Sequence, residues 1–298
     1  MRTWLDCIPC LVRQALDAAR ATTSDPRVHE RVVRETLALA ASMDLARPPP
    51  ALGQIVHRRL RAWTGVDDPY RETRQRFNRL VLEALPALAA RVDRAEDPLG
   101  AALALSVAAN TIDLGPHGSL TSAEILEALE AAQDQPLHGN PEAFREAEAR
   151  GGDILFLADN AGEIAVDRLL VERLGPARVT LVVRGAPVLN DAVLDDARAV
   201  GLSERVEVID NGSDAPGTLL SDCSDTFRDR FRRADLVLAK GQGNYETLSD
   251  ADREVYCLFK VKCALVSAHT GLPLGAHALL RTGAPYAPRD SARREDDA

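Results

Sequence analysis

The sequence of 298 residues has no apolar run that approaches the ~20 residues needed for a membrane-spanning helix. Its first residues, M-R-T-W-L-D-C, lack the apolar segment of a secretory signal peptide. Basic residues are in the minority, and the formal net charge of -9 is unfavourable for binding the phosphate backbone of nucleic acids. We therefore expect a cytoplasmic protein without membrane or nucleic-acid partners.

Cysteine is scarce, and its five copies are an odd number in a chain without a secretory signal, which is not typical of a disulfide framework. Two of them, Cys7 and Cys10, form a C-x-x-C motif, a spacing used by redox pairs and zinc sites. A structural zinc site needs about four ligands, and Cys257 and Cys263 would complete one if the N-terminal helix packed near them. Burial of small apolar side chains is the simpler interpretation.

Helical periodicity runs through residues 1–150. Apolar residues recur three and four apart, with charges between them, and prolines and glycines fall between the periodic segments. The expected helices are 7–21, 27–41, 51–64, 69–91, 100–109 and 122–133. T-S-A-E at 121–124 is a capping-box start for the last of them. We predict a helical N-terminal domain or cap over 1–150.

The pattern changes at Gly152, where short apolar runs alternate with helical stretches. Strands are expected at 154–158, 179–183, 206–209, 236–239 and 264–268, with a helix at 250–262 before the last strand. This spacing predicts right-handed crossovers and an α/β fold, a three-layer α/β/α doubly wound and mainly parallel sheet over 151–284. Residues 285–298 are expected to be a disordered tail.

Polar residues follow each of the first four expected strands, at 159–163, 184–191, 210–213 and 240–246. The carboxyl ends of parallel strands share one edge of the sheet, so these loops should converge. Carboxylate and amide oxygens suit Mg²⁺ or Mn²⁺, and Lys240 on a glycine-bearing turn suits a phosphate group. Asp, Asn and Gly are also common turn and cap residues, but four loops with complementary chemistry favour a site for phosphoryl chemistry.

Three well-known motifs are missing. The turn after the first strand is D-N-A-G-E-I, without the G-x-G-x-x-G of dinucleotide-binding folds, and no P-loop occurs anywhere. An aspartyl-phosphate enzyme would carry a second aspartate where this chain has Ala161. We therefore expect no nicotinamide or flavin cofactor, and metal-activated water is favoured over a covalent intermediate.

Three of the loop motifs resemble the damage-control phosphatase family, long catalogued as a domain of unknown function. They are D-N-A-G-E-I at 159–164, R-G-A-P-V-L-N-D-A at 184–192 and K-G-Q-G-N-Y-E at 240–246. The resemblance extends to D-P-Y at 68–70, N-T-I-D at 110–113, K-V-K-C at 260–263 and the N-terminal C-I-P-C. The similarity thus covers nearly the whole chain, and it is greatest to the prokaryotic branch with the N-terminal cysteine pair.

This resemblance implies a metal-dependent phosphatase that acts on small phosphorylated metabolites such as sugar phosphates or phosphopantetheine derivatives. Its cofactor would be a divalent metal, Mg²⁺, Mn²⁺, Co²⁺ or Ni²⁺. The metal ligands map onto Asp159, Asn160 and Asp191, of which the two aspartates would be catalytic. The substrate- or phosphate-binding candidates are Lys240, Gly241, Gly243, Asn244, Glu246, Lys262, Asn110, Asp113, Glu163 and Arg184. Cys7, Cys10 and Cys263 are candidates for a structural or redox role.

Two other functions remain open at this stage. The same loops would also suit a non-catalytic sensor that binds a phosphometabolite or nucleotide, with the cysteine pair as a redox or zinc element. An NADP-dependent oxidoreductase using Arg184 for the 2′-phosphate is disfavoured by the missing glycine motif. Replacing Asp159 or Asp191 with alanine separates the phosphatase from the sensor: it should abolish turnover by a phosphatase but spare metal-independent ligand binding by a sensor.

Overall fold

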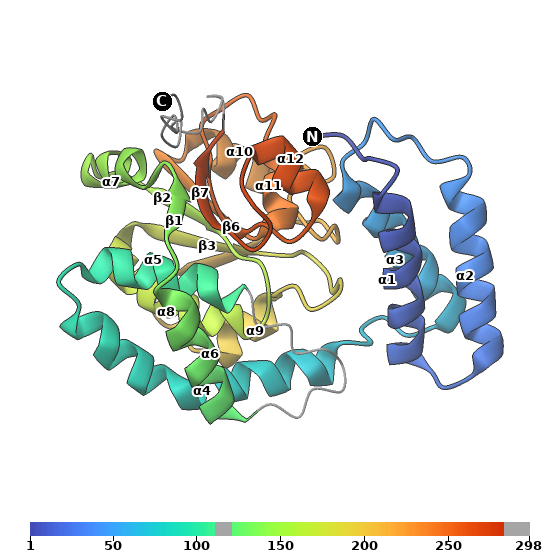
Figure 1. Cartoon of the computed structure of the whole chain (residues 1–298), viewed down its shortest axis with the longest axis horizontal. Coiled ribbons are helices and arrows are strands. Elements are labelled where there is room, and N and C mark those ends of the chain that lie inside the picture. The colour runs from blue at the N-terminus through green and yellow to red at the C-terminus, as the bar shows by residue number, and fades with distance from the viewer. Residues whose placement is uncertain (111–120, 283–298) are drawn as a thin grey trace, which may run out of the picture.

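The computed structural model describes residues 1–110 and 121–282 and shows a sheet with helices on both faces (Figure 1). The α-helices are α1 (Cys7–Thr22), α2 (Pro26–Ala40), α3 (Pro49–Thr64), α4 (Arg71–Arg94), α5 (Pro98–Ala109), α6 (Ser122–Gln133), α7 (Pro141–Ala149), α8 (Glu163–Leu174), α9 (Leu194–Ala199), α10 (Asp225–Arg233), α11 (Gln242–Leu248) and α12 (Ala264–Thr270), with a 3₁₀ turn, η1 (Pro176–Arg178). The strands are β1 (Leu137–Gly139), β2 (Ile154–Leu157), β3 (Val179–Val183), β4 (Glu207–Asp210), β5 (Leu236–Lys240), β6 (Tyr256–Lys260) and β7 (His277–Arg281).

The seven described strands form one sheet in the order β1-β7-β6-β5-β2-β3-β4. Every neighbouring pair is parallel except β6 and β7, which are antiparallel. Strand β2 is central, pairing with β3 on one side and β5 on the other. The mainly parallel α/β fold expected from the sequence is confirmed.

Two apolar cores, one on each face of the sheet, make the three layers. Ile154 and Phe156 of β2 belong to the core shared with α4, α5 and α8. Leu155 and Leu157, which point the other way, belong to the core shared with α10 and α11. A strand buried on both faces is apolar at every position, which is why β2 reads as an unbroken apolar run.

The first half of the chain is largely helical, as expected. Helices α1–α3 surround a small core of their own that includes Ala15, Val32 and Leu60, whereas α4–α6 share the core of the sheet. The capping box at Thr121 and Glu124 is confirmed: the Thr121 N–H donates to Glu124 Oε2 (2.7 Å), and the Glu124 N–H donates to Thr121 Oγ1 (3.3 Å). A domain boundary near residue 150 stays a prediction.

Two elements late in the chain were predicted wrongly. The segment 250–262, expected as a helix, contains strand β6, and 264–268, expected as a strand, lies in helix α12. A short apolar run has too few residues for its period to separate helix from strand. Strands β1 and β7, at and next to one edge of the sheet, were not expected at all. The tail 285–298 lies outside the described residues.

Two carboxylates, Asp214 and Asp222, bind helix α3 to the α/β part of the molecule. Asp214 accepts hydrogen bonds from Gln54 Nε2 (2.7 Å) and Arg58 Nε (2.9 Å), and it pairs with Arg61. These contacts hold α1–α3 beside the loops at the carboxyl ends of the strands. In the described parts of the chain, no helix is both long enough and apolar enough to cross a membrane.

Candidate active site

The loops after β2 and β3 are joined by a short antiparallel bridge between Asn160 and Asp191. The Ala161 N–H donates to Asn190 O (2.9 Å), and the Ala192 N–H donates to Asp159 O (2.8 Å). Backbone pairing therefore brings Asp159, Asn160 and Asp191 together at the carboxyl edge of the sheet. The sheet-edge argument from the sequence anticipated this proximity.

The loop reaches this arrangement through Leu189, whose φ of 48° is positive. Its backbone lies in a tight turn that the Asp191 N–H closes by donating to Val188 O (3.1 Å). A branched apolar residue in the left-handed region costs roughly 1–2 kcal/mol relative to ordinary backbone. Such strain is concentrated at functional sites, and here it lies two residues before Asp191.

Two amides hold the acidic groups at the base of the site. Asn110 Nδ2 donates to Asp159 Oδ2 and to Glu163 Oε2, both at 2.8 Å. Asn160 Nδ2 donates to the same two oxygens, at 2.7 and 3.1 Å. Asn110, the last described residue before 111–120, thus brings the helical half into the site, although it contacts the carboxylates there and its substrate contact stays a prediction. Asp113 lies outside the described residues.

The site carries more buried negative charge than its cations offset. Burial, with further repulsion from Glu163 and Asp191, raises the pKa of Asp159 to about 7 despite Arg184 and Lys262. Burial also raises the pKa of Asp191 against the opposing effect of Arg184. Burial acts in the same direction on Glu163, but there the charge of Lys240 and donated hydrogen bonds outweigh it and lower the pKa. A bound cation near Asp159 would relieve this imbalance.

Lys240 is completely buried beneath the acidic groups. Its Nζ donates to Glu163 Oε1 (2.6 Å), Asp167 Oδ1 (2.8 Å) and the backbone carbonyl of Ser106 (3.1 Å). An ammonium group has three protons, so all of them have partners in this structure. This differs from the direct phosphate contact that the sequence suggested: Lys240 fixes Glu163 in place and faces away from the cavity.

Arg184 also lies inside the protein rather than on the cavity wall, with 2% of its side chain exposed. Its Nε donates to Asp191 Oδ2 (2.7 Å), and its guanidinium lies 3.6 Å from Asp159 Oδ1. Its Nη1 donates to Asn244 Oδ1 (3.2 Å), so buried Asn244 orients the arginine. Arg184 therefore contacts the two aspartates from the protein interior, and Asn244 acts on them only through the arginine.

The glycines of the K-G-Q-G-N-Y-E loop allow close backbone approach. Gly241 has a φ of 81°, and a Cβ added there would overlap the Asp159 carboxylate. A Cβ on Gly243 would overlap the backbone oxygen of Pro216. Glycine is therefore required at 241 both by its conformation and by the packing of Asp159.

Lys262 is the exposed cation of the site. Its side chain lines the cavity, and its charge acts to lower the pKa of Asp159. It forms no ion pair with any residue that the structure describes, unlike Lys240 and Arg184. Its backbone N–H donates to Gln242 Oε1 (2.8 Å), which ties the K-V-K-C segment to α11.

Two cavities meet at the site. The first, here called the lysine lobe, has a volume of about 660 Å³ and is lined by Lys260, Asn110 and Glu163 among others. The second, the thiol lobe, has a volume of about 410 Å³, and its wall includes Asp159 and Asp191. The residues common to both walls are Gln14, Asn160, Leu189, Asn190 and Lys262.

Three cysteines, Cys7 and Cys10 from α1 and Cys263 from the start of α12, lie in the wall of the thiol lobe. All are free thiols. Cys257, considered as a fourth ligand, belongs to β6, is fully buried in the core of the sheet and does not line this lobe. Within 1–110 and 121–282, no group of three or more His, Cys, Asp or Glu residues is arranged to hold a metal ion.

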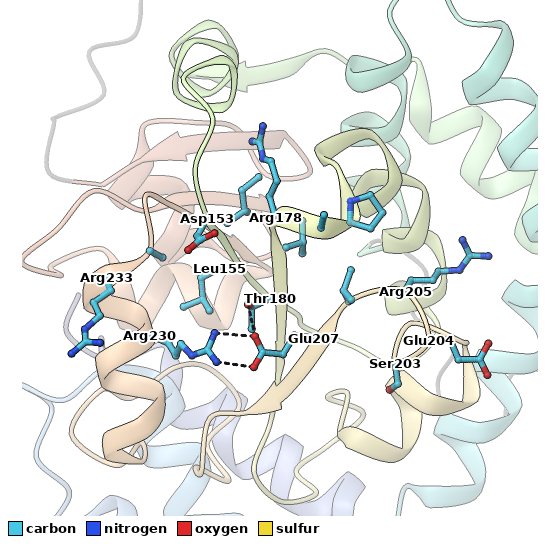
Figure 2. Close-up of a pocket in the computed structure, with 16 residues that line it drawn as sticks. Asp153, Leu155, Arg178, Thr180, Ser203, Glu204, Arg205, Glu207, Arg230 and Arg233 are labelled. Atoms are coloured by element: carbon cyan, nitrogen blue, oxygen red, sulfur yellow. Dashed lines mark hydrogen bonds and ion pairs between the residues drawn. The ribbon is translucent and has the colours of Figure 1, made fainter.

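A third cavity, of about 500 Å³, lies at the opposite edge of the sheet, where β2 and β3 begin (Figure 2). Figure 2 shows the Arg230 guanidinium paired with Glu207 among the residues that line it. Arg230 Nη1 and Nη2 donate to the two Glu207 carboxylate oxygens at 2.9 and 2.7 Å. Arg205 pairs with Glu172 (2.8 Å). Because Arg230, Glu207 and Arg205 already have partners, we place the functional site at the carboxyl edge, where the loops of the sequence motifs come together.

The sequence reasoning missed Asp167, Ser106 and Leu189. Asp167 had a signal, because it lies one helical turn after Glu163, is separated from it only by apolar residues and shares its helix face. Ser106 and Leu189 had none, since their roles come from a backbone carbonyl and a local φ angle.

Comparison with known proteins agrees with the fold and the motifs. Residues 3–278 match the model of the damage-control phosphatase ARMT1-like domain. A damage-control phosphatase of Archaeoglobus fulgidus is 32% identical over 90% of this chain and 95% of its own. An uncharacterised protein of Methanocaldococcus jannaschii is also 32% identical, over 93% of this chain and 94% of its own.

A solved relative gives the same result in three dimensions. The crystal structure of a DUF89 family protein from Pyrococcus horikoshii superposes with a TM-score of 0.86 at 26% identity, covering 95% of this chain and 99% of the other. Matches of this extent, in sequence and in structure, span both the helical half and the sheet. The chain therefore belongs to the damage-control phosphatase family, and this membership supports a phosphatase in metabolite repair.

Proposed function

We propose that this protein is a metal-dependent phosphatase that hydrolyses small phosphorylated metabolites. The observation that carries the proposal is the bridge between Asn160 and Asp191, which gathers two carboxylates and an amide beside the exposed cation Lys262. Family membership supports the phosphatase, and the site chemistry supports the metal dependence.

The donor set fits a hard divalent cation. Asp159, Asn160 and Asp191 offer only oxygen ligands, which suit Mg²⁺ or Mn²⁺, with Co²⁺ and Ni²⁺ as further candidates. The raised pKa of Asp159 marks uncompensated negative charge at this point. For a cation to bind, Asp191 must share or give up its hydrogen bond with Arg184. When bound, such a cation polarises a phosphoryl group and lowers the pKa of a water molecule.

The protein's own residues would position the substrate. Lys262 would bind the phosphate oxygens as a point charge, which stabilises the charge of the transition state. Asn110 and Asn160 keep the carboxylates of Asp159 and Glu163 in fixed orientations. Arg184 would retain the two aspartates in place from the buried side.

The cavity volumes suit a small molecule. The substrate would be a small phosphate monoester, and a sugar phosphate or a phosphopantetheine-like compound is the class that the family resemblance suggests. We also propose that the protein belongs to the branch of the family that carries the N-terminal cysteine pair. The position of Cys7, Cys10 and Cys263 in the wall of the thiol lobe supports this assignment.

A sensor without catalysis is the second candidate. Arg184 already pairs with Asp191, and Lys240 with Glu163. These pairs would let the loops bind a phosphate ligand without a metal.

Phosphate release from 4-nitrophenyl phosphate by chelator-treated protein separates the two. With Mg²⁺, Mn²⁺, Co²⁺ or Ni²⁺ added singly, we expect wild-type activity to return and Asp159→Ala to stay inactive. Asp210→Asn is the matched control, because Asp210 also ends a strand but lies on the outer strand β4. Folded wild-type protein that releases no phosphate with any metal, yet binds phosphate in chelator, would favour the sensor.

A further inference from the structure

The thiol lobe and the lysine lobe differ in whether they contain the two aspartates that would hold the phosphate. Asp159 and Asp191 both line the thiol lobe, and neither lines the lysine lobe. A phosphate held by these two residues therefore lies at the inner end of the thiol lobe. Its ester oxygen, and the first atoms of the group that leaves, must begin there.

The wall of the thiol lobe offers little positive charge to a substrate. Besides Asp159 and Asp191 it contains two further carboxylates, Asp6 and Glu246, and most of the rest is apolar or sulfur-containing, including Leu11, Met43, Leu52, Leu265 and the three cysteines. Lys262 is the one cation among the described residues that line it, and it lies at the boundary with the lysine lobe. A second phosphate or a carboxylate on the leaving group would have no other cationic side chain to pair with among the described residues of this lobe.

Burial shifts two thiols and one carboxyl group of this wall toward their uncharged forms. Burial, with repulsion from Glu246 and Cys263, raises the pKa of Cys7 and of Cys10. Burial raises the pKa of Glu246 to about 7, although its Oε1 accepts a hydrogen bond from Gln242 Nε2 (2.8 Å). The Gln242 amide also donates to Cys263 Sγ (3.5 Å), so the thiols form part of an ordered wall.

We propose that the thiol lobe is the leaving-group subsite of the phosphatase, and that it selects phosphate monoesters of uncharged, largely apolar alcohols over those of sugars or of compounds with a second anionic group. This inference rests on the proposed phosphatase function, and of the two substrate classes named there it disfavours the sugar phosphates. A water oxygen forms the new P–O bond, the ester P–O bond breaks, and the proton lost by the water ends on the released alcohol. The cysteines then act as neutral wall residues, with neither a disulfide nor a metal.

The protein carries its own reporters for this subsite. Cys7, Cys10 and Cys263 line it and are at least partly exposed, whereas Cys223 and Cys257 are buried elsewhere. We would measure the alkylation rate of each thiol by mass spectrometry, using iodoacetamide and the protein with the metal that supports hydrolysis. Two probes are compared, phenylphosphonate and methylphosphonate, which carry the same charged group and differ in the apolar ring.

At about ten times its Kd, phenylphosphonate should slow alkylation of Cys10 and Cys263 about tenfold, since the free fraction of sites is 1/(1 + [L]/Kd). Methylphosphonate should leave both rates within about twofold of the unliganded protein, and Cys223 and Cys257 should stay unlabelled throughout. In kinetics, kcat/KM should be higher for phenyl phosphate than for glucose 6-phosphate.

The inference is overturned if both phosphonates protect equally, or if phenylphosphonate neither protects the thiols nor inhibits hydrolysis. It is also overturned if glucose 6-phosphate is the better substrate. Failure of the proposed function gives a different result, namely no hydrolysis of any phosphate ester with any metal.

Discussion

The Lys240→Met variant separates a buried structural lysine from one that binds phosphate. Lys240 and Asp167 have no exposed side-chain surface, and Glu163 has 1%. Methionine has a similar length and no charge, so the variant leaves two buried carboxylates without their cation. Removing one partner of a buried ion pair typically costs about 3–5 kcal/mol of unfolding free energy.

The cost should depend on pH in a definite direction. In the wild type, Lys240 lowers the pKa of Glu163, so this stabilisation is present above the unfolded pKa of that group and is lost as the pH falls through the folded pKa. Without Lys240, burial leaves the folded pKa values of both carboxyl groups above their unfolded values. The variant then loses stability as the pH rises, and its deficit should grow between about pH 5 and pH 8.

Urea denaturation followed by far-UV circular dichroism, at several pH values, measures this deficit. Arg232→Met is the control, because Arg232 lies in an exposed ion pair with Asp229 and should cost less than about 1 kcal/mol. A Lys240→Met protein as stable as the wild type, but with weakened phosphate binding, would refute the buried role and restore the direct contact expected from the sequence.

Two further substitutions test how the site is built. Gly241→Ala should displace the Asp159 carboxylate and abolish phosphatase activity. Gly65→Ala is the control: Gly65 has a φ of 69° and nothing within 4 Å of an added Cβ, so the variant should lose only about 1 kcal/mol of unfolding free energy and keep its activity. Activity that survives Gly241→Ala would contradict the packing argument. Asp214→Asn should lower the unfolding free energy by about 1–3 kcal/mol at pH 7 and expose α1–α3 to limited proteolysis, because the Arg61 pair is weakened. Burial alone would raise the pKa of Asp214, but hydrogen bonds and charge from Arg58, Gln54 and Arg61 outweigh it and lower the pKa. The stabilisation by Asp214 is therefore lost as the pH falls through the folded pKa, and the difference in unfolding free energy between variant and wild type should disappear below about pH 4.

The central strands were predictable because burial on both faces requires an almost unbroken run of apolar residues. Strands β2, β3 and β5 are apolar along nearly their whole length and are bounded by turn residues. The end of the chain offered no such contrast. Tyr256–Lys260 and Ala264–Thr270 are both short and apolar, and only pairing with β5 and β7 makes the first of them a strand.

The site was predictable as a set of loops but not as a set of contacts. The sheet-edge rule brought Asp159, Asn160 and Asp191 together from the sequence alone. Nothing in the sequence indicated that the Lys240 side chain would point into the protein, because its partners belong to helices α5 and α8, which lie far from Lys240 in the sequence. That Cys10 and Cys263 line one cavity depends likewise on the tertiary positions of α1 and α12, which are far apart in the sequence.

The most direct test of the account is the binding of Mn²⁺, followed by the loss of the free-ion signal in electron paramagnetic resonance. The account predicts one ion per wild-type chain, binding weakened about tenfold or more in Asp159→Asn and in Asp191→Asn, and unchanged binding in Asp210→Asn. Mn²⁺ bound equally well by all four proteins, or by none, would contradict the assignment of the metal to Asp159, Asn160 and Asp191.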